Sequence, residues 1–311
     1  MLALAHGATR RIAGVCLALG VGAVLTVRAA SERAADAHAA DARAAVRDDI
    51  AADATPLGDT PASESDADET PPLRARFAAI TSATDIATSV GRARVVPPRG
   101  AAHPGDAPTI TFLHGACMSS TETCSRLDDV TEDGAWLVCP AGNASCGGDA
   151  SDWSGDGEEK ATFLDAAAGE ARGAIDLPRA SAARGDVLVG FSRGAFVARD
   201  VAYARPGRYR GLVLIGAATV PDAERLRESG IRRVVLSSGD YDGSRSTMVL
   251  ALAKLCSEGI PTRWVSLGAV WHALPADSPK RLRDALRWVR EDGDPGEDAC
   301  KRPPSVHVPG T

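Results

Sequence analysis

A serine flanked by glycines is the residue in this sequence best suited to chemistry. The segment Gly190–Gly194 reads Gly-Phe-Ser-Arg-Gly, follows an apolar run at 186–190 and opens a stretch with helical character. A strand, a sharp turn and a helix in this order are the setting that exposes a nucleophilic serine. Side chains in place of the two glycines would crowd the helix against the strand. We therefore predict that Ser192 is a nucleophile, the alternative being a packing turn without chemistry.

A serine nucleophile needs a neighbouring base, and elimination among the six histidines leaves His272. His114 directly follows an apolar run at 109–113, and we expect it to support its loop rather than to transfer protons. His272 comes six residues after the run at 262–266, in the loop by which that strand would end. Three of the remaining histidines lie outside the expected folded domain: His6 in residues 1–30, His38 in residues 31–72 and His307 in residues 292–311. The fourth, His103, lies before the run at 109–113 and so at the wrong end of that strand for the site.

An acid should orient the imidazole, and the loop after the run at 233–237 supplies two. Asp240 and Asp242 are two positions apart on this loop, so we expect their side chains to point the same way, and both qualify. One of them could instead cap the helix expected near Ser244. The chain order serine, aspartate, histidine is the one that a parallel sheet of this kind requires.

Charge that develops on a substrate oxygen needs backbone N–H donors. The segment 113–117 leaves its strand upstream of Ser192 and reads Leu-His-Gly-Ala-Cys. We predict an oxyanion hole made by the N–H of Arg193 and that of Ala116 or Cys117.

Short apolar runs that alternate with amphipathic stretches predict the elements that position these residues. The runs are rich in Val, Ile and Leu and too short for helices. Their alternation with helices predicts an α/β fold with a mostly parallel sheet covered on both faces, whose functional loops leave the carboxyl ends of the strands. Only residues 216–230 separate two of the strands, so we expect no large cap domain. We expect strands at 92–96, 109–113, 136–139, 186–190, 211–215, 233–237 and 262–266 and helices at 160–175, 192–205, 221–228, 244–258 and 279–291.

Over residues 76–291 the chain resembles an α/β-hydrolase. The resemblance rests on Phe-Leu-His-Gly at 112–115, on the serine motif, on Gly-Asp-Tyr-Asp at 239–242 and on the late His272. Trp153 and the stretch 159–165 are similar to secreted esterases of the polyhydroxybutyrate-depolymerase, feruloyl-esterase and dienelactone-hydrolase type. The family's acid usually stands three residues after a glycine, which implies a triad of Ser192, Asp242 and His272. The resemblance also implies that no metal or organic cofactor is needed.

These observations together predict a serine hydrolase that cleaves carboxylic esters through an acyl-enzyme. The expected partner is a small or polymeric ester. A peptidase or amidase would use the same triad, and a catalytically inactive hydrolase fold could serve as a binding protein at the cell surface.

The N-terminus predicts export. Arg10 and Arg11 precede an apolar run at 12–27, and small residues follow it, so residues 1–30 are expected to be a signal peptide. An uncleaved anchor is the alternative, and only then would the protein meet a membrane. Residues 31–72 hold eleven acidic side chains against three arginines and few bulky apolar residues, which predicts a disordered linker. The rest of the chain is nearly neutral, which disfavours nucleic acid as a partner. The expected hydrolase domain is 73–291, followed by an irregular tail at 292–311.

Six cysteines remain after the one in the leader, and an even number behind a leader predicts disulfides in a secreted or cell-envelope protein. Six cysteines allow 15 pairings, among which sequence cannot choose. We favour local pairs that flank loops: Cys117 with Cys124, Cys139 with Cys146, and Cys256 with Cys300.

Overall fold

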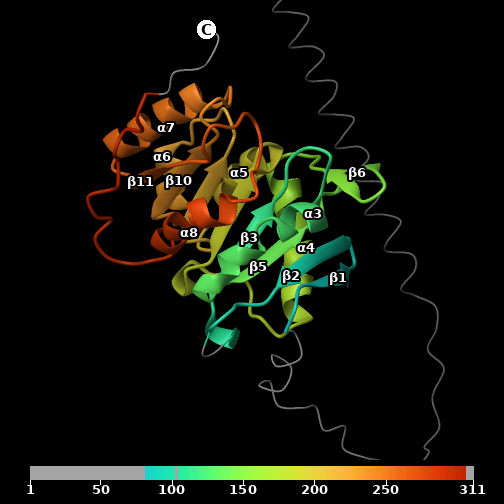
Figure 1. Cartoon of the computed structure of the whole chain (residues 1–311). Coiled ribbons are helices and arrows are strands. Elements are labelled where there is room, and N and C mark those ends of the chain that lie inside the picture. Colours follow the sequence, from blue (N-terminus) through green and yellow to red (C-terminus); the bar gives the residue numbers. More distant parts are fainter. Residues whose placement is uncertain (1–80, 102–103, 306–311) are drawn as a thin grey trace, which may run out of the picture. The chain divides into compact units, whose positions relative to one another are not determined.

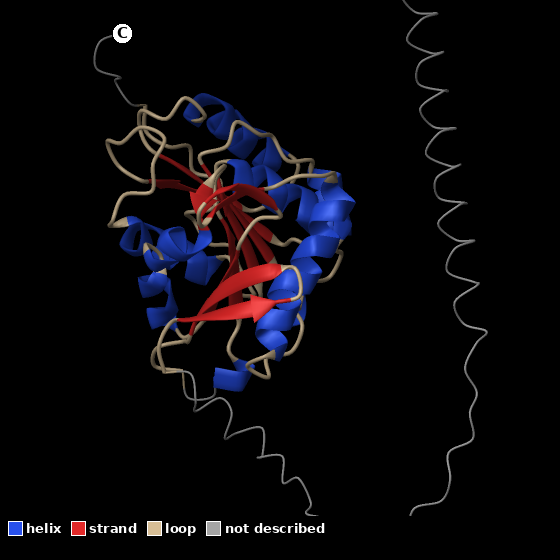
Figure 2. Cartoon of the chain, turned by 90° about the vertical axis from the view of Figure 1, so that its right-hand side faces the viewer, coloured by secondary structure: helices blue, strands red, loops and turns tan. Residues whose placement is uncertain are grey.

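A computed structural model describes residues 81–101 and 104–305, and these belong to one compact unit. The predicted signal peptide and linker lie outside the described residues. Helices and strands form three layers, with a central sheet between two sets of helices (Figures 1 and 2). Among the described helices, none is long and apolar enough to cross a membrane.

The central sheet has eight strands, and the six that follow the first two in spatial order are parallel to one another. The spatial order is β1-β2-β5-β3-β8-β9-β10-β11, and only the β1–β2 and β2–β5 pairs are antiparallel. The strands are β1 Thr84–Thr88, β2 Gly91–Val96, β3 Thr109–Leu113, β5 Trp136–Pro140, β8 Val187–Phe191, β9 Gly211–Ile215, β10 Arg233–Ser238 and β11 Thr262–Ser266.

Each face of this sheet packs against its own helices, because successive side chains of a strand point to opposite faces. In β9, for example, Leu212 and Leu214 lie in one core cluster, and Val213 and Ile215 lie in the other. The first cluster includes side chains of α4 (Gly157–Gly173), α5 (Arg193–Ala204), α6 (Ala223–Glu228) and α7 (Arg245–Ser257). The second includes those of α3 (Ser120–Ser125), the 3-10 helix η3 (Asp128–Asp133) and α8 (Ser278–Trp288). Figure 2 shows these two sets of helices on opposite sides of the strands.

A second, small sheet lies beside the loops that follow β3 and β5. Its strand order is β4-β7-β6, with β4 at Met118–Ser119, β6 at Ala144–Gly147 and β7 at Ala150–Asp152. Two further short 3-10 helices are η2 at Pro104–Asp106 and η4 at Ala182–Arg184.

The structure confirms the α/β fold and all seven expected strands, with ends that differ by one residue at most. The five expected helices are present with shifted ends, and the link between β9 and β10 holds only α6. The sequence pattern missed β1, the small sheet, α3 and η3. These elements are too short or too polar for an apolar period to stand out.

Two of the three favoured disulfide pairs were wrong. Cys117 is bonded to Cys146 and Cys124 to Cys139, whereas Cys256 pairs with Cys300 as favoured. The reason is the strand order. Since β3 and β5 are parallel neighbours, the segments that leave their carboxyl ends lie side by side, and cysteines from one segment meet those of the other.

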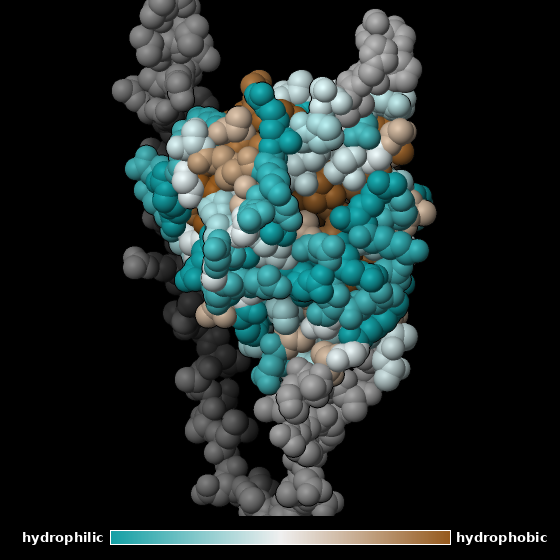
Figure 3. Space-filling model, turned by 60° about the vertical axis from the view of Figure 1, so that its left-hand side comes forward, coloured by the Kyte–Doolittle hydropathy of each residue, from teal (hydrophilic) through white to brown (hydrophobic). Residues whose placement is uncertain are grey.

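The surface on the α8 and tail side is mostly hydrophilic, with a smaller hydrophobic area in its upper half (Figure 3).

Candidate active site

Ser192 sits on a tight turn between β8 and α5. Its backbone has φ 55° and ψ −120°, a conformation that side-chain-bearing residues rarely adopt. A Cβ at Gly190 would lie 2.2 Å from the carbonyl oxygen of Gly194, and one at Gly194 would lie 2.1 Å from that of Leu113. Only glycine therefore allows the turn to close, and the turn keeps the serine at the carboxyl end of the sheet.

The predicted base and one of the two predicted acids lie in line with this serine. His272 Nε2 is 2.8 Å from Ser192 Oγ, and His272 Nδ1 is 2.8 Å from Asp242 Oδ2. The carboxylate can only accept at Nδ1, so the Nδ1 proton is donated to it and Nε2 is free to accept from the serine hydroxyl. The His272 side chain is 47% exposed, so the site is open to solvent, whereas that of Asp242 is 4% exposed.

The two aspartates of the acid loop have different partners. Asp242 Oδ1 accepts the backbone N–H of Ser244 at 2.8 Å, so this carboxylate also caps the segment that enters α7. Asp240 instead accepts from the hydroxyl of Ser266, the last residue of β11, at 2.7 Å. The expectation that both side chains point the same way was therefore wrong.

Opposing effects act on the pKa of Asp242. Burial alone would raise this pKa, but the backbone N–H of Ser244 and the His272 ring donate hydrogen bonds to the carboxylate and lower it below its usual value. The acid is therefore ionised throughout the neutral range and can stabilise a positive charge on His272.

The loop after β3 lies against Ser192. A Cβ at Gly115 would come within 3.2 Å of the Ser192 Cβ, so the backbone of this loop is next to the nucleophile. Arg193 is the first residue of α5, where a backbone N–H has no partner within the helix. Ala116 is exposed on the same loop. That these two N–H groups form the oxyanion hole stays a prediction.

His114 is buried and holds this loop in place. Its Nε2 accepts from the backbone N–H of Gly142 at 3.1 Å, and its Nδ1 is 2.7 Å from the carbonyl oxygen of Gly115. The Gly142 N–H also bonds to Ser151 Oγ at 2.8 Å, and this hydroxyl lies 3.1 Å from Nε2. The Gly115 carbonyl can only accept, so Nδ1 carries the proton. Burial lowers the pKa of His114, which favours the neutral form. Trp153 packs on the ring at 5.0 Å and donates its indole N–H to the His114 carbonyl.

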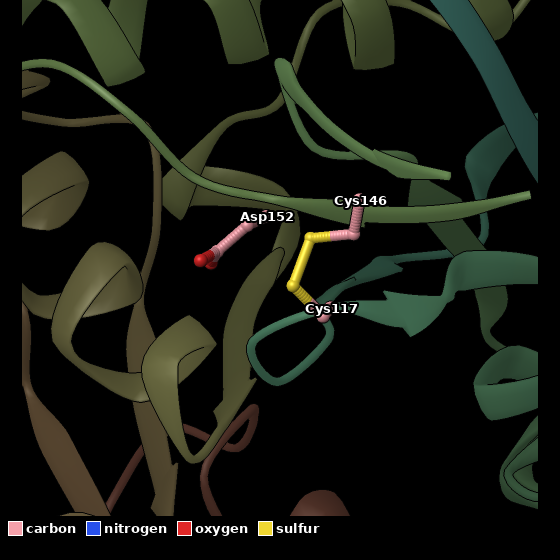
Figure 4. A group of neighbouring side chains, drawn as sticks. All are labelled: Cys117, Cys146 and Asp152. Carbon is pink, nitrogen blue, oxygen red and sulfur yellow. A yellow bond between two sulfur atoms is a disulfide. The ribbon is translucent and has the colours of Figure 1, made fainter.

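A disulfide closes the other end of the same loop. Figure 4 shows Cys117 at the end of the loop, bonded to Cys146 of β6, with the carboxylate of Asp152 nearby. The three side chains lie close enough to hold a metal ion, but bonded sulfurs are not thiolate ligands. Asp152 is 3.8 Å from Arg193 Nε, so the small sheet also contacts the residue after the nucleophile.

Two contacts of the site escaped sequence reasoning. The ring of Phe191 stacks on that of His272 at 5.2 Å. Gly216, directly after β9, lies against the histidine and the acid, since a Cβ there would be 3.1 Å from Asp242 Oδ2 and 3.1 Å from His272 Cε1. A glycine at a strand exit was a usable signal for Gly216, whereas nothing in the sequence shows the contact of Phe191. The bond from Ser244 to the acid was expected only as an alternative to the contact with His272, and Asp242 makes both.

Comparisons with known proteins agree with the observed architecture. No protein-family model and no curated protein match the sequence. A ferulic acid esterase of known structure superposes with a TM-score of 0.50 at 11% identity, over 67% of this chain and 96% of that one. Two other similar structures are TT1662 from Thermus thermophilus (TM-score 0.49, 18% identity, 68% and 98% covered) and esterase PE8 (0.48, 20%, 67% and 98%). At such low identity the likeness shows the fold alone: the chain has an α/β-hydrolase fold.

Proposed function

We propose that the protein is a serine hydrolase that cleaves carboxylic esters. The observation that carries this proposal is the continuous hydrogen-bonded line from Ser192 through His272 to the buried Asp242, with 2.8 Å at each step. A nucleophile, a base and an orienting acid in this arrangement are what acyl transfer requires.

The reaction follows from the donors and acceptors of the site. His272 Nε2 takes the hydroxyl proton as Ser192 Oγ attacks the ester carbonyl, and Asp242 stabilises the imidazolium. The N–H groups of Arg193 and Ala116 bind the negative oxygen of the tetrahedral intermediate. The imidazolium then gives its proton to the leaving alcohol, and a water molecule, deprotonated by the same ring, releases the acid from Ser192.

The open site supports an accessible ester, small or polymeric, as substrate. Three disulfides support a site of action outside the cytoplasm. Thiol counting on the denatured, unreduced protein from its native host tests that part, and six free thiols would contradict it.

A fluorophosphonate probe tests the chemistry. We expect covalent labelling of the wild type, and none of Ser192→Ala, whose kcat should fall by about 10⁴-fold or more. His272→Ala should lose about as much, and the double variant little more. A folded wild type that is not labelled would favour a binding protein without activity. Alkyl esters and aminoacyl anilides, compared by kcat/KM, separate an esterase from a peptidase or amidase.

A further inference from the structure

Trp271 is a large apolar side chain that stays in solvent beside the histidine of the site. Trp271 is 65% exposed. Of the large hydrophobic residues that are exposed in the described part of the chain, it is the one with an aromatic side chain. The neighbouring residue along the chain, whose Cα lies about 3.8 Å away, is His272. A single exposed apolar side chain is common, but an exposed indole next to the histidine that contacts Ser192 offers an apolar face to whatever binds there.

The indole is held in position without being covered. The N–H of Ala273 bonds to the Trp271 carbonyl at 2.9 Å, which closes a tight turn around His272. The N–H of Tyr241 bonds to the carbonyl of Val270 at 3.1 Å, and this joins the loop that carries His272 to the loop that carries Asp242. The Tyr241 ring lies 5.7 Å from the Trp271 ring, tilted by 51°. The turn that positions the base therefore also positions the backbone of Trp271, and the Tyr241 ring contacts the indole.

We infer that Trp271, with Tyr241 beside it, forms a subsite for a flat ring of the substrate. This inference rests on the proposed function. An exposed indole that no other part of the protein covers can contact only one face of a bound substrate group. A rigid ring can lay a whole face on it and loses little conformational freedom, whereas a flexible alkyl chain would lose more. An aromatic ring and the C–H face of a sugar share this chemistry, and the ring would be attached a few bonds from the ester carbonyl.

Matched ester pairs test the subsite. Methyl phenylacetate is compared with methyl hexanoate, and a methyl glucoside acetylated at O6 with hexyl acetate, each by kcat/KM. We expect the wild type to prefer the ring-bearing ester of at least one pair, and the pair shows whether the ring is aromatic or a sugar. Trp271→Ala should lower that preference about tenfold, mainly through KM, and Trp271→Phe should restore part of it.

Leu250→Ala is the control, because Leu250 is 66% exposed on α7 and plays no part in the site. It should change neither pair. An unchanged preference in Trp271→Ala, or equal losses for both members of each pair, would overturn the subsite. Should the wild type fail to hydrolyse any ester and resist fluorophosphonate, the proposed function fails. Saturation-transfer NMR with methyl phenylacetate and the acetylated glucoside then tests the subsite alone, and equal signals from wild type and Trp271→Ala refute it.

Discussion

At the scale of single residues, the site depends on which atoms meet rather than on which residue types are present. Asp240 and Asp242 have the same side chain and are two positions apart, yet one contacts His272 and the other Ser266. The carboxylate that accepts the Nδ1 proton fixes the tautomer of the ring, and only that tautomer leaves Nε2 free for the serine.

Exchange of each aspartate for asparagine should separate these two roles. We expect Asp242→Asn to lower kcat by about 10⁴-fold with the fold intact, because the amide can donate to Nδ1 and so favours the wrong tautomer. Asp240→Asn keeps an acceptor for Ser266 and should cost less than about tenfold. Steady-state kinetics with a labile ester measure both variants. If Asp240→Asn proved the more damaging of the two, the acid would be Asp240.

Gly216 permits a second prediction at this scale. Gly216→Ala would press a methyl group against Asp242 and His272, and a displacement of the base by about 1 Å costs roughly 100-fold in rate. Gly259→Ala is the matched control, since its φ of +80° is similar to the +60° of Gly216 but nothing lies within 4 Å of the added methyl. Each variant should lose about 1 kcal/mol of stability from the positive φ. Only Gly216→Ala should also lose kcat, and similar rates for the two variants would contradict the contact.

At the scale of elements, sequence predicts best what is local. Ser192 and His272 could be predicted because a strand–turn–helix motif and a strand exit are read along the chain. The contact of Gly216 with His272 and the pairing of Cys117 with Cys146 depend on which strands are neighbours in the sheet. The residues alone left both aspartates open, and only the family resemblance pointed to Asp242. Apolar runs predict that strands exist but not their spatial order. β1 was missed because its sequence, Thr-Asp-Ile-Ala-Thr, has one strongly apolar residue and its outer position in the sheet requires no more.

The loop after β3 gives a pH-dependent prediction through His114. The pKa of this residue is lower in the folded protein than its unfolded value of 6.5, so the unfolded state binds the extra proton. The stability that the neutral ring contributes is complete above about pH 6.5 and is lost as the pH falls toward the folded pKa. Protonation would also place an Nε2–H opposite the Gly142 N–H. Ser151 Oγ, 3.1 Å from Nε2, could accept the new proton, and the charge of Asp152 offsets part of the cost.

His114→Phe measures this contribution, since it keeps a ring beside Trp153 but cannot titrate. We expect the wild type to be the more stable at pH 8, and the advantage to shrink between pH 7 and pH 5. Thermal unfolding across this range gives Tm for both proteins. Parallel Tm curves would show that His114 is not the group that titrates.

At the scale of the whole molecule, the tail after α8 is attached mostly by contacts other than strand pairing. Arg233 donates to the carbonyl oxygen of Gly293 at 2.8 Å, Arg245 to that of Pro304 at 2.8 Å, and the N–H of Cys300 to that of Thr262 at 2.7 Å. The disulfide from Cys256 of α7 to Cys300 adds a covalent link across 44 residues. The tail therefore covers the β11 side of the sheet.

The two solvent-accessible disulfides should differ in what they support. Cys256→Ala with Cys300→Ala opens the 44-residue loop, which typically costs about 2–5 kcal/mol of stability, or about 5–15 °C in Tm for a domain of this size. Its kcat at 25 °C should stay unchanged, because Cys300 bonds to Thr262 at the amino end of β11, whereas Ser192 follows the carboxyl end of β8. Cys117→Ser with Cys146→Ser opens a 29-residue loop, so the expected loss of stability is similar. Cys117, however, directly follows Ala116, the proposed oxyanion donor. A loosened loop misplaces that N–H, so kcat should fall about tenfold as well. Differential scanning fluorimetry gives Tm and ester kinetics give kcat for both double variants. A loss of kcat in the Cys256/Cys300 variant, or full kcat in the Cys117/Cys146 variant, would contradict the roles expected for the two disulfides.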